Sequence, residues 1–148
     1  MERGVINHAL VAGSSKIASN YVFPGTSSDG GHSEADGYPP MGTRFQLDPN
    51  YMTNERLATY PVWEQPILRA LRDYGMYLGD SGGAASFSLA IESGTTYTAF
   101  GLEDEMVKYV RRIGVPQNGD GIYYLDLDNV DWASHLRAIA PCVSERNC

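Results

Sequence analysis

The sequence predicts an α+β protein, strand-rich, with a β-sandwich-like or jelly-roll-like sheet and about three short helices. Three observations support this class. Strand-like segments come early in the chain, helical segments come late, and the two do not alternate regularly. Ten tyrosines, sixteen glycines and eight prolines favour strands, tight turns and loops. The 148 residues, 43% of them hydrophobic, suit a single domain, residues 1–148, with one buried core.

The first half of the chain is predicted to hold three strands and a loop. "GVINHALVAG" (4–13) is apolar on both faces, which is typical of a central strand covered on both sides. "SNYVFPG" (19–25) resembles a neighbouring strand that ends at Pro24-Gly25. Residues 26–40 form a polar loop with nothing to bury, and residues 41–48 alternate with the period of a strand.

The clearest helix is predicted over residues 63–75. Pro66 falls in its first turn, where a missing N–H costs nothing, and Gly75 ends it. Its apolar stripe consists of Ile67, Leu68, Leu71 and Tyr74. The remaining predicted elements are strands 76–80, 85–93 and 121–128 and helices 102–114 and 129–140, the last capped by Asp128 or Asn129.

Strand 4–13 also predicts that the chain is part of a larger fold. A strand that is apolar on both faces needs neighbours on both sides, and the chain offers only five further, mostly short strands. We therefore expect the missing strands to come from an N-terminal remainder of a parent protein or from another chain. Considered alone, this chain should expose an apolar patch around Val5, Ala9 and Val11.

Charge and cysteine usage limit the possible partners. The net charge is −7, and no basic cluster exceeds the pair Arg111-Arg112, which argues against nucleic acid and against an anionic membrane surface. No apolar run is long enough to span a membrane. Cys142 and Cys148 either close a small disulfide loop, which favours a secreted protein, or are free thiols.

The string GDSGG (79–83) surrounds the nucleophilic serine in chymotrypsin-like proteases, which makes Ser81 a candidate. Three features argue against a protease. The string follows a helix and a short strand, His8 lies in INHAL rather than AAHC, and 148 residues are too few for two six-stranded barrels. We therefore expect Gly82-Gly83 to form the turn between strands 76–80 and 85–93.

A resemblance to a known family covers residues 4–83. The segments GVINHAL, YVFPG, PPMGTRFQL and ALRDYGMYLGDSG resemble, in order and spacing, the C-terminal half of a family of largely uncharacterised secreted bacterial proteins. That family carries G-x-I-x-H-A-L, Y-x-W-P-A, P-P-M-G-x-R-x-x-L and A-L-K-x-Y-G-M-x-x-A-D-x-G. YVFPG lacks the tryptophan, and Ser81 falls at a variable position of the family pattern. The resemblance implies a larger, secreted parent protein and no established reaction.

Three residues are candidates for catalysis. His8, predicted in mid-strand, is either a general acid/base or a core histidine with a backbone partner. Arg44 can hold a carboxylate, such as a uronate or Asp80, either for function or as a buried structural pair. Asp80 ends a strand beside glycines, where it either meets a ligand or caps a turn.

Aromatic residues are candidates for ligand binding. Tyr74 and Trp63 can stack on a sugar, although the helical spacing of Tyr74 places it in the core first. Metal motifs are weak: residues 126–131 lack the ligands of a calcium loop, and His32 lies in the polar loop. We expect no metal and no cofactor.

Two functions remain open. The first is a secreted glycan-active protein, a lyase or hydrolase, in which His8 is the acid/base and Arg44 and Asp80 position a carbohydrate. The alternative is a non-catalytic carbohydrate-binding or structural module of a secreted assembly. A catalytic site requires these three side chains to meet at one point.

Overall fold

The computed structural model describes residues 5–82, 87–90, 95–119, 121, 123 and 125–141. The chain divides into two compact units, one of residues 1–90 with 131–148 and one of residues 91–130. None of the helices in the described ranges has the length and the hydropathy that a membrane crossing requires.

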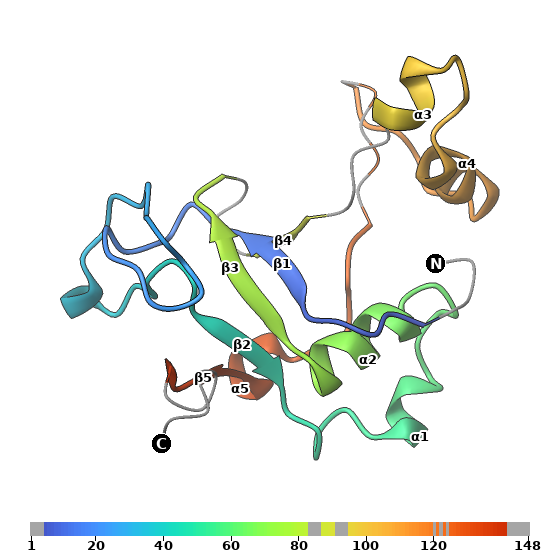
Figure 1. Cartoon of the computed structure of the whole chain (residues 1–148). Coiled ribbons are helices and arrows are strands. Elements are labelled where there is room, and N and C mark those ends of the chain that lie inside the picture. Colours follow the sequence, from blue (N-terminus) through green and yellow to red (C-terminus); the bar gives the residue numbers. More distant parts are fainter. Residues whose placement is uncertain are drawn as a thin grey trace. The chain divides into compact units, whose positions relative to one another are not determined.

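The first unit is built on one mixed sheet, in the order β4-β1-β3-β2-β5 (Figure 1). Its strands are β1 (Leu10–Gly13), β2 (Arg44–Leu47), β3 (Met76–Asp80), β4 (Ser88–Leu89) and β5 (Leu136–Ile139). β1 and β3 are parallel, and the other pairs are antiparallel. The α+β prediction is confirmed. The described residues form no second sheet facing this one, so they do not support the predicted sandwich or jelly roll.

β1 is shorter than predicted. Only the last four of residues 4–13 form a strand, and they lie inside the sheet between β3 and β4, as expected of a central strand. The ladder starts where β3 starts, because Leu10 N donates to the carbonyl of Gly75, the residue that ends the preceding helix (2.9 Å). Residues 5–9 therefore precede this ladder, and none of the strands in the described ranges pairs with them. Of the residues of the predicted apolar patch, Val5 and Val11 are 51% and 48% exposed and Ala9 is half-buried.

Three other predicted strands are shorter in the structure than expected or are only isolated bridges. Residues 19–25 contain a single bridge, from Tyr21 to Met41. In the described part of residues 121–128, which leaves out residues 122 and 124, Tyr123 forms a bridge to Gln117. Of residues 85–93 only Ser88–Leu89 is a strand, and residues 85–86 and 91–93 lie outside the described residues. β3 and β4 are not hairpin partners, because β1 lies between them, and Gly83 of the predicted turn lies outside the described residues.

The predicted helix 129–140 is wrong in its second half. Asp131, rather than Asp128 or Asn129, caps a short helix α5 (Trp132–His135), and the chain then continues as β5. The four residues of β5 pair with the four residues of β2 in full register. A longer helix would leave that edge of β2 unpaired, so the sheet overrides the local pattern.

The predicted helix 63–75 is confirmed as α2 (Gln65–Asp73), with Pro66 in its first turn. Gly75 ends it at φ +77°, and its amide donates to the Ala70 carbonyl (2.9 Å). Two side chains of β2 satisfy carbonyls at this end. Gln46 Nε2 donates to Arg72 O (2.6 Å), and Arg44 donates from Nε (3.1 Å) and Nη2 (2.8 Å) to Tyr74 O.

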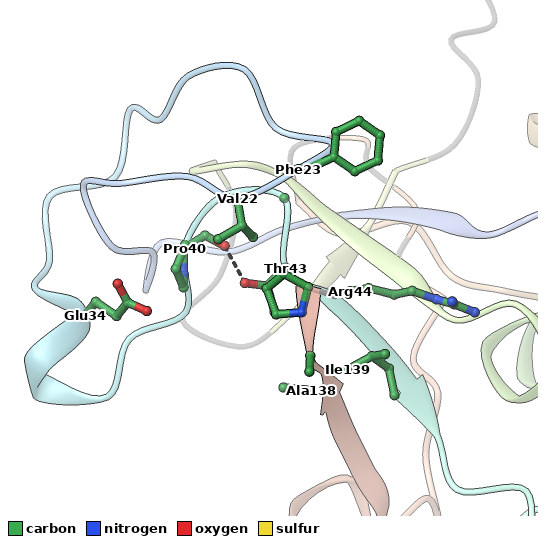
Figure 2. A pocket seen from close by; sticks show the side chains of 11 residues that line it. Val22, Phe23, Glu34, Pro40, Thr43, Arg44, Ala138 and Ile139 are labelled. Atoms are coloured by element: carbon green, nitrogen blue, oxygen red, sulfur yellow. Dashed lines mark hydrogen bonds between the residues drawn. The ribbon is translucent and has the colours of Figure 1, made fainter. Parts of the chain in front are cut away.

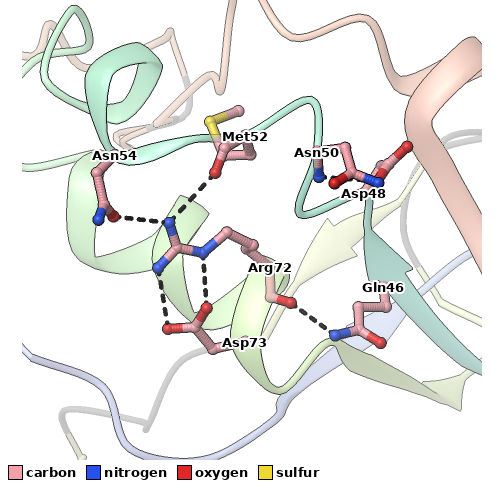
Figure 3. Close-up of polar contacts among 7 residues, drawn as sticks. All are labelled: Gln46, Asp48, Asn50, Met52, Asn54, Arg72 and Asp73. Atoms are coloured by element: carbon pink, nitrogen blue, oxygen red, sulfur yellow. Dashed lines mark hydrogen bonds and ion pairs between the residues drawn. The ribbon is translucent and has the colours of Figure 1, made fainter.

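Arg72 ties α2 to a helix that the sequence analysis did not predict, α1 (Asn54–Leu57), as Figure 3 shows. Its guanidinium donates to the Met52 carbonyl (3.2 Å) and the Asn54 side chain (2.9 Å), and it forms two bonds to the Asp73 carboxylate (2.6 and 3.2 Å). The Arg72 side chain is only 15% exposed, so its hydrogen bonds are largely shielded from water. They fix the position of α1 relative to α2.

The core beneath the sheet contains Leu78 of β3 together with Ile17 and Met41 from the connections around it, with Phe45 of β2 packed against them. In β3 the buried Met76 and Leu78 alternate with the half-buried Tyr77 and the exposed Gly79, as expected for a strand with one covered face.

The second unit contains α3 (Thr95–Ala99), which was not predicted, and α4 (Glu105–Arg112), which confirms the helix expected over 102–114. The Asp104 carboxylate accepts from Met106 N (2.7 Å) and caps α4, while Val110 is buried. Arg111 donates to the Tyr123 hydroxyl (2.9 Å) and pairs with Glu103.

Gly75→Ala should destabilise the first unit more than Gly37→Ala does. Both glycines have positive φ (+77° and +85°), but a Cβ at Gly75 would overlap the Phe45 carbonyl oxygen, whereas nothing lies within 4 Å of one at Gly37. Urea unfolding should give a loss of about 1–2 kcal/mol for Gly37→Ala and about 1–3 kcal/mol more for Gly75→Ala. Equal losses would contradict this close approach.

Candidate functional site

The structure gives Arg44 a structural role. Its guanidinium is directed at the Tyr74 carbonyl at the end of α2, as described above, and not at a carboxylate. The ion pair with Asp80 that the sequence analysis considered is not formed. Arg44 instead joins β2 to the turn between α2 and β3.

His8 and Asp80 lie at different ends of β3. His8 is exposed, precedes β1 instead of lying in mid-strand, and donates from Nδ1 to the Ala9 carbonyl (2.9 Å). Leu10, two residues on, is bonded to Gly75 at the start of β3, whereas Asp80 is its last residue. Five strand residues span roughly 16 Å. The three predicted catalytic residues therefore do not meet at one point.

The contacts of the remaining candidate residues do not indicate a ligand site. The Asp80 carboxylate accepts from Gly82 N (3.1 Å), which is the turn-capping alternative, and Ser81 sits half-buried in that turn. Tyr74 is 39% exposed, so the prediction that it packs in the core is wrong, and Trp63 is half-buried before α2. Cys142 and Cys148 lie outside the described residues, and so does their predicted disulfide.

The metal candidates of the sequence analysis have other contacts. His32 stacks on Tyr38, with ring centroids 4.2 Å apart, and Asp131 caps α5 through a bond from Ser134 N (3.2 Å). Within the described ranges, no three His, Cys, Asp or Glu side chains are grouped as a metal site would require.

The polar loop at residues 26–31 is anchored, although the sequence analysis expected it to bury nothing. Ser28 Oγ donates to the Ala18 carbonyl (2.7 Å) and accepts from Gly30 N (3.1 Å). His32 N donates to Ile17 O (3.1 Å), and Ser19 N donates to His32 O (2.9 Å). Gly30 lies so close to the chain at Ile17 and Ala18 that a Cβ there would overlap both of their carbonyl oxygens. The loop is therefore fixed to residues 17–19 by hydrogen bonds and by close backbone packing.

This loop forms one wall of a groove of about 450 Å³, here called the loop groove. Strands β1 and β3 contribute Val11, Tyr77, Leu78 and Gly79, and the other lining residues are Pro24, Gly25, Thr26, Ser27, Ser28, Asp29, Met41 and Gly42. The volume falls within the range of small-molecule sites in proteins.

The floor of the loop groove is one face of the sheet. Val11 and Tyr77 are partners in the parallel ladder, so their side chains project from the same face, and Gly79 follows Tyr77 on that face. A Cβ on Gly79 would lie 2.8 Å from Val11 Cγ1. The absence of a side chain at Gly79 therefore leaves room for the Val11 side chain on this face of the sheet.

A second hollow of about 270 Å³, shown in Figure 2, shares Gly42 with the loop groove as a lining residue. It is mostly apolar, with Val22, Phe23, Pro40 and the segment 138–141 around it. Its charged residues are already engaged, because Glu34 accepts from Asn20 (2.6 Å) and Arg44 bonds Tyr74. This hollow therefore offers fewer polar groups to a ligand than the loop groove does.

A polar cluster around Tyr51 joins the start of α5 to the region of α1. The Tyr51 ring stacks on His135, with centroids 3.7 Å apart, and Arg56 lies over the same ring. The Tyr51 hydroxyl accepts from Arg56 (2.8 Å) and from Asp131 N (2.9 Å). Burial raises the pKa of nearby Tyr60. These contacts give the cluster a structural role: they connect α5 to the region of α1.

The loop groove could not be predicted from the polarity of residues 26–40, which is typical of an exposed loop. The signal that could have found it is glycine spacing. Gly25, Gly30 and Gly42 each stand where another backbone segment comes close, and Gly42 at φ +87° would overlap the Val22 carbonyl if it carried a Cβ.

Comparison of the chain with protein-family models, with curated proteins and with solved structures finds no match.

Gly30→Ala should loosen the loop, whereas Gly31→Ala should not. Neither glycine has positive φ, but a Cβ at Gly30 meets two carbonyl oxygens and one at Gly31 meets nothing within 4 Å. We expect Gly30→Ala to lower the free energy of unfolding by about 1–3 kcal/mol and Gly31→Ala to change it by less than about 0.5 kcal/mol. Faster proteolysis within the loop should accompany only the first change. Identical behaviour of the two variants would show that the loop is not packed against residues 17–18.

Asp131→Asn should reduce the acid sensitivity of folding. Hydrogen bonds from Ser134 hold the pKa of the Asp131 carboxyl below its usual value, and His135 and Arg56 lower it further. A depressed folded-state pKa adds stability above the unfolded pKa of about 4, and this stability is lost as pH falls through the folded pKa.

The control for this prediction is Asp128→Asn, three residues earlier. Melting curves between about pH 5 and 2 should fall less steeply with pH for Asp131→Asn than for the wild type, while Asp128→Asn should match the wild type. The reverse order would place the N-cap of α5 at Asp128, as the sequence analysis expected.

Proposed function

We propose that this protein is a non-catalytic carbohydrate-binding module of a secreted assembly and that the sugar binds in the loop groove. The observation that carries the proposal is the lining of that groove. Three successive residues with hydroxyl side chains, Thr26, Ser27 and Ser28, line the same groove as Tyr77. Sugars present hydroxyl groups at their edges and apolar C–H groups on their faces, so they need both kinds of lining.

The fixed position of the loop supports this proposal. A flexible binding loop must be ordered when its ligand binds, and that cost weakens affinity. Ser28 holds the loop through the Ala18 carbonyl and the Gly30 amide, while the Thr26 and Ser27 hydroxyls make no hydrogen bond to any described residue. The groove thus combines an anchored backbone with hydroxyls left for a ligand.

The distribution of ionisable groups favours binding over catalysis. Glycoside hydrolysis commonly uses two carboxylates that flank the scissile bond. Asp29 is the one carboxylate among the described residues that line the loop groove, and His8, Arg44 and Asp80 are not among them. A lyase or hydrolase built on those three residues would need a rearrangement of β3 and its neighbours.

Binding should be measured by calorimetry against a panel of neutral and charged oligosaccharides, with variants on and off the groove. Tyr77→Ala and Ser27→Ala should each lower affinity, the first by about tenfold, since a stacked aromatic contributes about 0.5–1.5 kcal/mol in addition to its buried area. Tyr74→Ala is the matched control, because it removes a tyrosine that is 39% exposed and does not line the loop groove.

The two variants test the proposal in different ways. Ser27 lies on the exposed loop, so its substitution leaves the fold intact even if Tyr77→Ala destabilises the sheet. The proposal fails if no oligosaccharide binds to the wild type, or if Ser27→Ala and Tyr77→Ala bind as the wild type does.

A further inference from the structure

We propose that the loop groove selects amino sugars, with the protonated amine paired to the Asp29 carboxylate. This inference rests on the proposed function and names the class of sugar that the same site prefers. Asp29 carries the only ionised side chain among the described lining residues, all others being neutral. The local charge of the groove is therefore negative, in a protein whose net charge is −7.

The backbone around Asp29 is fixed on both sides. Ser28, before it, donates to the Ala18 carbonyl, and Gly30, after it, donates to Ser28 and lies against the Ile17 and Ala18 carbonyls. The Cα of Asp29 is thus held between two anchored residues. Its carboxylate makes no hydrogen bond or ion pair with any described residue, which leaves it for a ligand.

The same arrangement disfavours uronates, the ligands that the sequence analysis had associated with Arg44. The Arg44 guanidinium is bound to the Tyr74 carbonyl and does not line the loop groove. No lysine or arginine lines it among the described residues either. A sugar carboxylate would therefore face Asp29 without a compensating cation, and like charges at close range repel.

The expected size of the preference follows from the strength of a charged hydrogen bond. Such bonds contribute enough to change an equilibrium constant by about tenfold or more. Hydroxyl contacts and the Tyr77 ring should bind neutral sugars as well, only more weakly. The amine–carboxylate pair should weaken with added salt, because the groove is open to solvent at the loop.

The experiment is calorimetric titration of the intact chain at about pH 5.5, where amines are protonated and aspartates ionised. The probes are trisaccharides of glucosamine, N-acetylglucosamine and galacturonic acid. Asp29→Asn is the test variant. Asp36→Asn is the control, because it removes the same charge from the 3₁₀ turn Glu34–Asp36, none of whose residues lines the loop groove.

The proposal predicts tightest binding of the glucosamine trimer, about tenfold loss of that affinity in Asp29→Asn, unchanged affinity in Asp36→Asn, and no detectable galacturonate binding. A salt-dependent affinity for glucosamine alone, measured on the wild type, tests the ion pair without any variant.

Different failures have different meanings. Equal binding of the charged and neutral trimers, unaffected by salt or by Asp29→Asn, would overturn the amino-sugar preference and leave carbohydrate binding standing. Equal losses in Asp29→Asn and Asp36→Asn, or a preference for galacturonate, would also overturn it. The absence of binding to every trimer would overturn both proposals.

Discussion

Leu78 joins the sheet, the core and the polar loop, and the loop groove depends on these contacts. Its amide donates to Thr43 O (2.9 Å), and its carbonyl accepts from Gly42 N (2.7 Å), so β3 is bonded to the chain just before β2. Its side chain packs against Ile17 and Met41 in the core. Met41 in turn accepts from Val22 N, and Ile17 accepts from His32 N, so the segments on both sides of residues 26–31 are fixed to the same core. A groove wall that looks like surface loop thus rests on buried contacts.

Local patterns in the sequence were sufficient where an element is decided by its own residues. The helix α2 could be predicted because Pro66 starts it and Gly75 ends it, and β3 follows directly. Elements that need a distant partner were predicted less well. Residues 5–9 have the pattern of a strand but pair with no strand that the structure describes. Residues 136–139 fit a helical pattern yet pair with β2, about ninety residues earlier. Pairing between remote segments cannot be inferred from one sequence's periodicity.

The candidate site shows the same division. Residue type correctly marked Arg44 and Asp80 as polar groups with specific partners, but those partners are a helix-end carbonyl and a neighbouring amide. Chemistry-bearing side chains were therefore poor guides to a site in this chain. The residues that shape the loop groove are glycines and hydroxyl side chains, whose effect depends on how closely backbone segments approach. That information enters only with the three-dimensional structure, although the glycine spacing gives a partial indication of it.

The central claim is that the loop groove exists before any ligand binds, because its wall is bonded to the core around Leu78. Native-state amide hydrogen exchange tests this most directly. The amides of Gly42, Val22 and His32 donate to Leu78, Met41 and Ile17, respectively, and should exchange within about tenfold of the rate for the Leu78 amide, as expected for groups that open only with the core. Exchange of Gly42, Val22 and His32 as fast as that of an unprotected loop amide, with Leu78 still protected, would contradict the claim.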